Sequence, residues 1–366
     1  MTQGTLAPPA WLNRGVLLRS SPASEHQLIR HVLAYCLAQQ YELPALLVID
    51  YLVAIKSSPF VLLFGPRGQG KTELVRLFAQ ALTAPFDDQY TYVNCGVQFD
   101  QTAVQFQDRF SWIKFNETLE TAANPANTGK LFFLCLDRLR FSDVAAYFAK
   151  TVRGADGHLR LVMRGYPADR WPILPPNVII TGTLDADDLH APQQSSALAH
   201  VNCVYVHKQW LPQPRHQRII PRSIAPIGYQ TALLDHALRT DEAVHGRIES
   251  LLGSHGDDVL QPPVELVSIL WQAHLTYDDA WRSAMLRTVA NSFTMDGRGL
   301  FIQHNTVQNA QFAYTFAMAR QMLLRLWGHQ HYEQQLEHVL HTLLDTMLLS
   351  TLTDINGVSW NEADHA

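Results

Sequence analysis

Apolar positions along the first two thirds of the chain follow two different periods. From His26 to Ile55 they recur at spacings of three and four, as on one face of a helix. Short continuous apolar runs follow, which are typical of strands buried in a parallel sheet. The predicted strands are 59–64, 90–94, 131–136, 178–181 and 203–207, and helices are predicted over 73–82 and 142–152. Strands that alternate with helices predict an α/β layer fold, with a parallel sheet and helices on both faces.

One segment interrupts this alternation without ending it. Between residues 154 and 177, glycines and prolines surround the apolar segment His158–Met163. Turn-forming residues around a short apolar run are typical of a β-hairpin. We therefore predict a hairpin inserted into the α/β domain near 154–177.

A second change in the pattern predicts a domain boundary. Between Pro212 and Pro226, prolines, arginines and glutamines replace the strand pattern, and beyond it only helical periodicity remains. The pattern therefore divides the chain into three parts. They are an N-terminal arm (1–24), an α/β domain (25–225) and an all-α C-terminal part (226–366).

The composition agrees with a folded chain of about two domains of roughly 150 residues each. The 366 residues include 28 Lys and Arg against 33 Asp and Glu, which leaves a formal net charge of −5. Only 17% of the residues are charged and 47% are hydrophobic, a balance that excludes a disordered chain. The charge gives no sign of bulk nucleic-acid affinity. One compact basic segment, Arg215–Arg222, is either a solvated linker or a phosphate contact.

Cysteine use and the apolar runs predict a cytoplasmic protein without a membrane partner. No cysteine stands in a CxxC pair and each lies beside apolar residues, which favours buried free thiols in a reducing compartment over disulfides or a metal site. The cysteines are Cys36, Cys95, Cys135 and Cys203. The N-terminus lacks the pattern of a signal peptide. The most apolar stretch, 43–56, is interrupted by Asp50 and is too short to span a bilayer.

The strongest chemical signal is the glycine-rich loop from Gly65 to Thr72, which matches G-x-x-x-x-G-K-[ST] at every fixed position. Glycines let backbone N–H groups converge on phosphate oxygens, and the helix that follows points its positive end to the same place. Lys71 would reach the β- and γ-phosphates while the Thr72 hydroxyl holds Mg²⁺. The residues predicted to bind nucleotide are Gly65, Pro66, Arg67, Gly68, Gln69, Gly70, Lys71, Thr72 and Glu73. The alternative is an ordinary strand–turn–helix unit with glycines.

A second apolar strand, 131–136, is followed by Asp137. Ligands gather at the carboxyl edge of a parallel sheet, and a carboxylate oxygen suits Mg²⁺. We therefore predict Thr72 and Asp137 as the metal ligands, with a turn-capping Asp as the alternative. ATPases of this kind usually place a Glu after the Asp to polarise the attacking water. Here Arg138 follows, and a guanidinium cannot accept a proton at neutral pH, so the sequence leaves open whether nucleotide is hydrolysed by the usual route.

The order of these motifs resembles the AAA+ ATPases of the McrB and MoxR-like branch. Residues 182–185 read Gly-Thr-Leu-Asp where the branch has Gly-Thr-Met-Asn after an apolar strand, and 137–143 stand where the branch reads Asp-Glu-Ile-Asn-Arg-Ala-Asp. The Gln-Phe pair at 98–99 is also similar, and 323–328 resemble a Leu-Pro-Lys-Leu-x-Gly signature. The resemblance covers about residues 25–350. It implies a P-loop AAA+ α/β domain followed by an all-α lid domain.

Three positions depart from the branch where it hydrolyses nucleotide. Arg138 stands at the catalytic Glu, and Asp185 aligns with the sensor Asn that helps to place the attacking water. Ala199-His200 aligns with the Asp-Arg pair that supplies a finger to the neighbouring subunit. Loss of one such group typically costs orders of magnitude in rate, so the departures imply a subunit that holds nucleotide and turns it over slowly. The alternatives are an alignment shifted by one or two residues, and Asp185 acting as a substitute acid.

The helical part contains two further candidate features. In AAA+ proteins a helical lid covers the nucleotide and presents an Arg to the γ-phosphate. Arg282 is the candidate and Arg287 the second choice, with a surface ion pair as the alternative. A late cluster of histidines forms either a polar helix face or part of a metal site. The cluster contains His329, His331, His338 and His341.

The resemblance implies a nucleotide-binding subunit that uses ATP or GTP with Mg²⁺. The predicted catalytic set is Lys71, Asp137, Asp185 and Arg282. The implied partners are other AAA+ subunits in a homo- or hetero-oligomeric ring or arc, and a protein effector such as a nuclease, in defence against foreign DNA. Two alternatives stay open: an active MoxR-like chaperone that remodels a protein partner, and a DNA-organising AAA+ protein whose binding to duplex falls with salt. The net charge of −5 weighs against the last.

Overall fold

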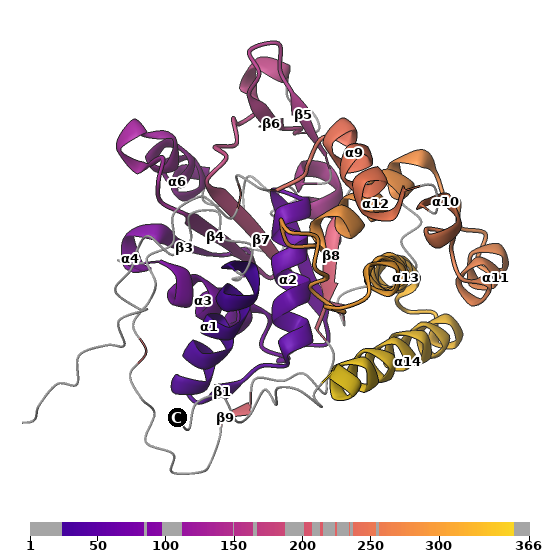
Figure 1. Ribbon diagram of the computed structural model, residues 1–366. Helices are drawn as coiled ribbons and strands as arrows, with labels where there is room; N and C mark the ends of the chain where they lie inside the picture. Colours follow the sequence, from indigo (N-terminus) through magenta and orange to yellow (C-terminus); the bar gives the residue numbers. More distant parts are fainter. Residues whose placement is uncertain are drawn as a thin grey trace, which may run out of the picture.

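The computed structural model shows an α/β domain joined to a group of C-terminal helices (Figure 1). The structure describes residues 24–83, 86–96, 112–148, 150–163, 167–186, 201–206, 213–214, 224, 234, 237–253 and 256–354. The predicted N-terminal arm lies outside these residues except for Ser24. The motif matches at 98–99 and 199–200 and the basic segment Arg215–Arg222 lie outside them as well.

Five parallel strands form the central sheet in the order β3-β4-β7-β2-β8. The strands are β2 (Phe60–Gly65), β3 (Tyr90–Asn94), β4 (Phe132–Asp137), β7 (Val178–Asp185) and β8 (Asn202–Tyr205). Every residue of β2, β4 and β7 is buried, as expected for a parallel sheet covered on both faces. The parallel sheet and the helices after it confirm the predicted fold class as far as an α/β domain followed by an all-α part.

Four helices of the α/β domain pack around this sheet. They are α1 (Ser24–Ala38), α2 (Ala45–Ser57), α3 (Lys71–Leu82) and α6 (Trp112–Ala123). Helix α3 begins where the glycine-rich loop ends and packs against β2, β4 and β7, while α1 packs against α3 and α2. Helix α6 and the short helix α4 (Phe86–Gln89) lie against β3. The sheet and α3 together position the loop.

The helical pattern over 26–55 belongs to two helices. Gln40 has a φ of 68° and ends the turn that follows α1, and β1 (Tyr41–Glu42) then pairs antiparallel with β9 (Gln213–Pro214). Pro44 precedes α2, because proline is tolerated at the start of a helix and not inside one. Apolar periodicity alone does not reveal such a break.

The predicted helix over 142–152 is wrong at its C-terminal end, where residues 151 and 152 belong to a strand. Helix α7 (Phe141–Asp143) continues as a π-helical turn over Val144–Phe148, and the chain then becomes extended. Strand β5 (Thr151–Arg153) pairs antiparallel with β6 (Leu159–Leu161), since cross-strand pairing overrides the local helical pattern. This hairpin projects away from the central sheet at the top of Figure 1.

Six helices make up the described C-terminal part. They are α9 (Asp241–Leu252), α10 (Gly256–Val259), α11 (Val264–Gln272), α12 (Asp279–Asn291), α13 (Thr306–Leu326) and α14 (Gln330–Asp354). Side chains of Thr240, Asp278 and Asn305 accept hydrogen bonds from the first turns of α9, α12 and α13, which fixes where these helices begin. Helix α13 packs on β8 and α14, and α12 packs on α2 and α9.

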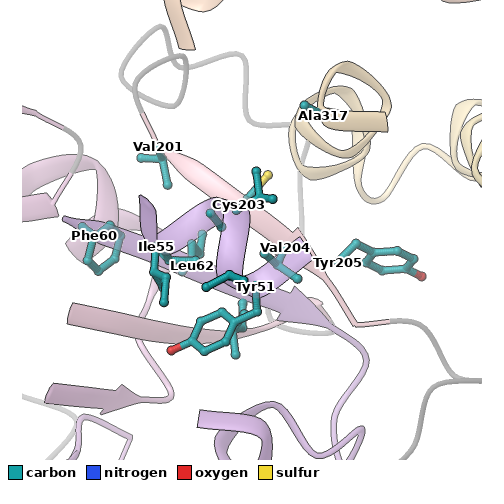
Figure 2. Packing of buried hydrophobic residues seen from close by; sticks show 14 of the residues in the cluster. Tyr51, Ile55, Phe60, Leu62, Val201, Cys203, Val204, Tyr205 and Ala317 are labelled. Atoms are coloured by element: carbon teal, nitrogen blue, oxygen red, sulfur yellow. The ribbon is translucent and has the colours of Figure 1, made fainter. Parts of the chain in front are cut away.

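Apolar packing and buried charges both join the C-terminal helices to the α/β domain. Figure 2 shows the apolar packing around β8, which includes residues of α2, β2, β8 and α13: Tyr51, Leu62, Cys203 and Ala317. Asp50 of α2 forms a fully buried ion pair with Arg320 of α13, 270 positions away. Asp50, which interrupts the apolar stretch 43–56, thus bonds the α/β domain to the C-terminal helices.

Three expectations from composition can be compared with the described part of the chain. All four cysteines are buried and free. Among the described residues, no helix is long and apolar enough to cross a membrane. No three His, Cys, Asp or Glu side chains in that part group closely enough to hold a metal ion, so the described histidines of the late cluster form no such site.

Candidate nucleotide-binding site

The glycine-rich loop connects the carboxyl end of β2 to the start of α3. Its backbone has positive φ at Gly65 (148°), Gly68 (78°) and Gly70 (75°), a region that favours glycine. A Cβ atom on Gly65 would lie 2.4 Å from the carbonyl oxygen of Val206, so the close approach of the chain after β8 also requires glycine. Gly70 caps α3 without a side chain, which leaves the N–H groups of the first turn available to an anion.

Lys71, in the first turn of α3, is buried and held by three oxygen atoms. Its Nζ atom donates to the carbonyl oxygens of Gly65 (2.9 Å) and Pro66 (2.8 Å). It also pairs with Asp185 Oδ1 at 2.8 Å. Arg67 Nε lies 3.2 Å from Asp185 Oδ2. The carboxylate at the end of β7 is therefore bonded to both cationic side chains of the loop.

Asp137, at the end of β4, accepts hydrogen bonds from three hydroxyl groups. Thr72 and Thr183 donate to Oδ1, the latter at 2.8 Å, and Tyr92 donates to Oδ2 at 2.9 Å. Thr72 and Asp137 are the predicted metal ligands, and the structure brings them into direct contact. A hydroxyl and a carboxylate are hard oxygen ligands of the kind that Mg²⁺ prefers, so these two residues fit one shared ion.

Arg138 follows Asp137 in a left-handed backbone conformation, with a φ of 58°. Its N–H donates to Thr183 Oγ1 at 2.9 Å, and its Nε atom lies 3.8 Å from Asp137 Oδ2. The side chain is 56% exposed and lies over Gly96, where a Cβ atom would come within 2.6 Å of it. A guanidinium in this place donates hydrogen bonds to an anion and takes no proton from water.

Tyr92 and Thr183 complete the site and were not among the predicted site residues. Burial and the Asp137 carboxylate raise the pKa of Tyr92, so its phenol stays protonated and donates. Thr183 stands in the segment 182–185 that resembles the branch, but that resemblance gives it no role, and a polar residue in an apolar strand is an ambiguous signal. Thr181 on the same strand is equally polar, yet it bonds to the buried Tyr51 hydroxyl at 2.7 Å.

Glu73 lies in the first turn of α3, and its carboxylate is bonded to Arg76, with 2.8 Å between Arg76 Nε and Glu73 Oε2. Burial acts to raise the pKa of Glu73, but the hydrogen bond and charge of Arg76 outweigh it and lower the pKa overall. The side chain is thus committed to a neighbour on its own helix. A contact of Glu73 with nucleotide would have to use its backbone N–H group.

The two candidate sensor arginines lie on α12. Burial raises the pKa values of Tyr277 and Tyr314, and the positive charge of Arg282 acts against the shift at both phenols. Arg287 Nη1 lies 3.5 Å from Asp241 Oδ1 of α9. These contacts belong to the helical part, and an approach of either arginine to a γ-phosphate stays a prediction.

The strand order and the loop define the class of this chain as a P-loop α/β protein with a helical C-terminal part. No protein-family model and no curated protein matches its sequence. Among solved structures, PCH-2 from C. elegans is 12% identical with a TM-score of 0.24, over 84% of this chain and 67% of that one. NtrX from Brucella abortus, solved in complex with ATP, is 11% identical with a TM-score of 0.21, over 81% and 66%. Scores this low carry no argument about function.

Proposed function

We propose that this protein is an AAA+ subunit that binds ATP or GTP with Mg²⁺, turns it over slowly, and works as a switch or scaffold in an oligomeric assembly. The observation that carries the proposal is the convergence of Lys71, Thr72 and Asp137 at the N-terminus of α3. Arg138 stands beside this group where a general base would be needed.

Three features support nucleotide binding. The loop glycines have positive φ values, and backbone N–H groups in a loop curled in this way can converge on an anion. The N-terminus of the 12-residue helix α3 adds a partial positive charge at the same place. Lys71 supplies a full positive charge on a buried, positioned side chain. Thr72 and Asp137 would hold the Mg²⁺ ion, which neutralises phosphate charge when it is bound.

Slow turnover follows from the groups beside the metal-binding pair. Arg138 has no proton acceptor in its side chain, and Asp137 is occupied by three hydroxyl donors. Asp185 is an acceptor, but Lys71 and Arg67 both bind its carboxylate, so it is already engaged and is not positioned to accept a proton from an attacking water. Loss of a positioned base or stabilising group typically reduces rates by roughly 10²–10⁴-fold.

The assembly role rests on the resemblance to the McrB and MoxR-like branch. A subunit that holds nucleotide without rapid turnover stabilises an interface while a more active partner hydrolyses. We therefore propose cytoplasmic partners of two kinds: other AAA+ subunits in a ring or arc, and an effector such as a nuclease in defence or a client protein in remodelling. The nucleotide then controls whether the subunits associate.

Binding of fluorescent ATP and GTP analogues to the full chain, with and without Mg²⁺, tests the first part of the proposal. Lys71→Ala should weaken binding by about tenfold or more, because the loop loses its full positive charge. Lys114→Ala, on the exposed side of α6, is the matched control and should bind as the wild type does. Mass photometry of the same samples should show nucleotide-dependent oligomers. Equal binding by the Lys71→Ala and wild-type proteins would contradict the proposal.

A further inference from the structure

Asp185 places a carboxylate where, in a P-loop protein, the terminal phosphate of the bound nucleotide lies. Strands β7 and β2 pair in parallel register, so Asp185 lies directly opposite Gly65, the first residue of the glycine-rich loop. The side chain is buried, with 9% of its area exposed. From this we propose that Asp185 makes the site select nucleoside diphosphate over nucleoside triphosphate. The inference rests on the proposed nucleotide binding.

The contacts of Asp185 form a complete internal anion site. Its Oδ1 atom lies 2.8 Å from Lys71 Nζ, and its Oδ2 atom lies 3.2 Å from Arg67 Nε. In a glycine-rich loop of this kind, the lysine is the group that reaches toward the terminal phosphates. The carboxylate therefore already holds the atom to which a γ-phosphate would bind. A triphosphate must therefore either break the ion pair between Lys71 and Asp185 or bind the Lys71 ammonium together with Asp185.

Sharing is unfavourable because the γ-phosphate and Asp185 carry the same sign. Both would lie within hydrogen-bond distance of one Nζ atom, and like charges this close repel strongly in a poorly solvated site. The negative charge of Asp137, the other carboxylate nearby, is neutralised by Mg²⁺ when the ion is bound. Among the described residues, the cations paired with Asp185 are Lys71 and Arg67, and Arg67 is 65% exposed and screened by water.

A diphosphate reduces this repulsion. Its β-phosphate also reaches Lys71, but the backbone N–H groups of the loop and the start of α3 hold its phosphates, and it brings no third phosphate to the end of β7. The Lys71–Asp185 pair can then persist beside it. The resting state of the proposed switch is accordingly the diphosphate-bound one, and triphosphate binding is the step that breaks an ion pair.

Calorimetric titration of the full chain with Mg-ADP, Mg-ATP, Mg-GDP and Mg-GTP tests this selection. The wild type should bind the diphosphate of its preferred base more tightly than the triphosphate. Asp185→Asn removes the charge and keeps the shape, and it should shift the ratio of the two affinities toward triphosphate at least tenfold, which is about 1.4 kcal/mol. Asp156→Asn, on the β5–β6 hairpin, is the charge-matched control and should leave the ratio unchanged.

The outcomes separate this inference from the proposed function. If neither the wild type nor Asp185→Asn binds any of the four nucleotides, the proposed function itself is wrong. If both bind and the ratio is the same, the site binds nucleotide but Asp185 does not select among phosphates, and the inference is overturned. A wild-type preference for triphosphate overturns it as well. Asp185→Ser provides the same comparison if thermal melting shows that the Asn variant does not fold.

Discussion

Arg138 combines an unusual backbone with a side chain that changes the chemistry of the site. Its φ of 58° lies in a region that costs a residue with a Cβ atom roughly 1–2 kcal/mol. The Thr183 hydroxyl holds the conformation by accepting from the Arg138 N–H group at 2.9 Å. The same turn sets Asp137 against Thr72, so the strained residue and the metal-binding pair depend on one another.

Arg138→Gly should raise the free energy of unfolding by up to about 1 kcal/mol, because glycine relieves the left-handed strain and loses only part of that gain to unfolded-state entropy. Urea denaturation of both proteins measures the change. Arg140→Gly, two positions on at a φ of −83°, is the matched control: it stands at the start of α7, where glycine is tolerated and relieves no strain, so the free energy of unfolding should not rise. An equal change in the two variants would show that Arg138 is not strained.

At the scale of the elements, the loop depends on how closely β8 and its continuation approach β2. Gly65 faces the Val206 carbonyl oxygen, whereas a Cβ atom on Gly68 would meet nothing within 4 Å. Both glycines have positive φ, but Gly65 at 148° lies farther from the left-handed helical region than Gly68 at 78°. Gly65 therefore combines backbone strain with a close contact, whereas Gly68 has strain alone.

Gly65→Ala should cost about 2–4 kcal/mol of stability, since the new methyl group forces two backbones apart. Gly68→Ala should cost only roughly 1–2 kcal/mol, which is the strain alone. Thermal melting of the two variants compares them directly. A larger loss for Gly68→Ala would contradict the close approach of the strands.

What the sequence predicts at this scale depends on how local the information is. The glycine-rich loop and Asp137 are predictable, because short-range spacing determines a turn and the end of a strand. Tyr92 and Thr183 are not, because they reach Asp137 only through the register of β3, β4 and β7. The left-handed backbone conformation of Arg138 cannot be predicted either, since arginine has no preference for that conformation. The overestimated helix over 142–152 failed because pairing of β5 with β6 outweighs local periodicity.

At the scale of the whole molecule, buried charge joins the helices to the α/β domain. Asp50 and Arg320 pair inside the packing of α2 and α13. Burial raises the pKa of Asp50 to about 6, although the Arg320 charge opposes the shift. The Lys56 ammonium makes a second connection between the two parts, since it pairs with Glu25 of α1 and donates to the carbonyl oxygen of Asn291 of α12 at 3.2 Å. These buried contacts bond the helical part directly to the α/β domain.

Arg320→Met should cost about 3–5 kcal/mol, because it leaves Asp50 buried without a partner, and adding Asp50→Leu should recover most of that loss. The loss should be smaller at about pH 5 than at about pH 8. The folded-state pKa of Asp50 lies above its unfolded value, so the folded protein binds the extra proton and gains stability as the pH falls through that pKa. Urea denaturation at both pH values measures this. A loss that does not change with pH would contradict an isolated Asp50 charge.

The proposed nucleotide binding with weak turnover can be tested in one measurement. Binding and phosphate release are followed in the same sample of full-length protein, with Mg-ATP and with Mg-GTP, beside Lys71→Ala as the background. We expect saturable binding that depends on Lys71, with phosphate release close to the Lys71→Ala level. Rapid phosphate release by the wild type alone, abolished by Lys71→Ala, would contradict it.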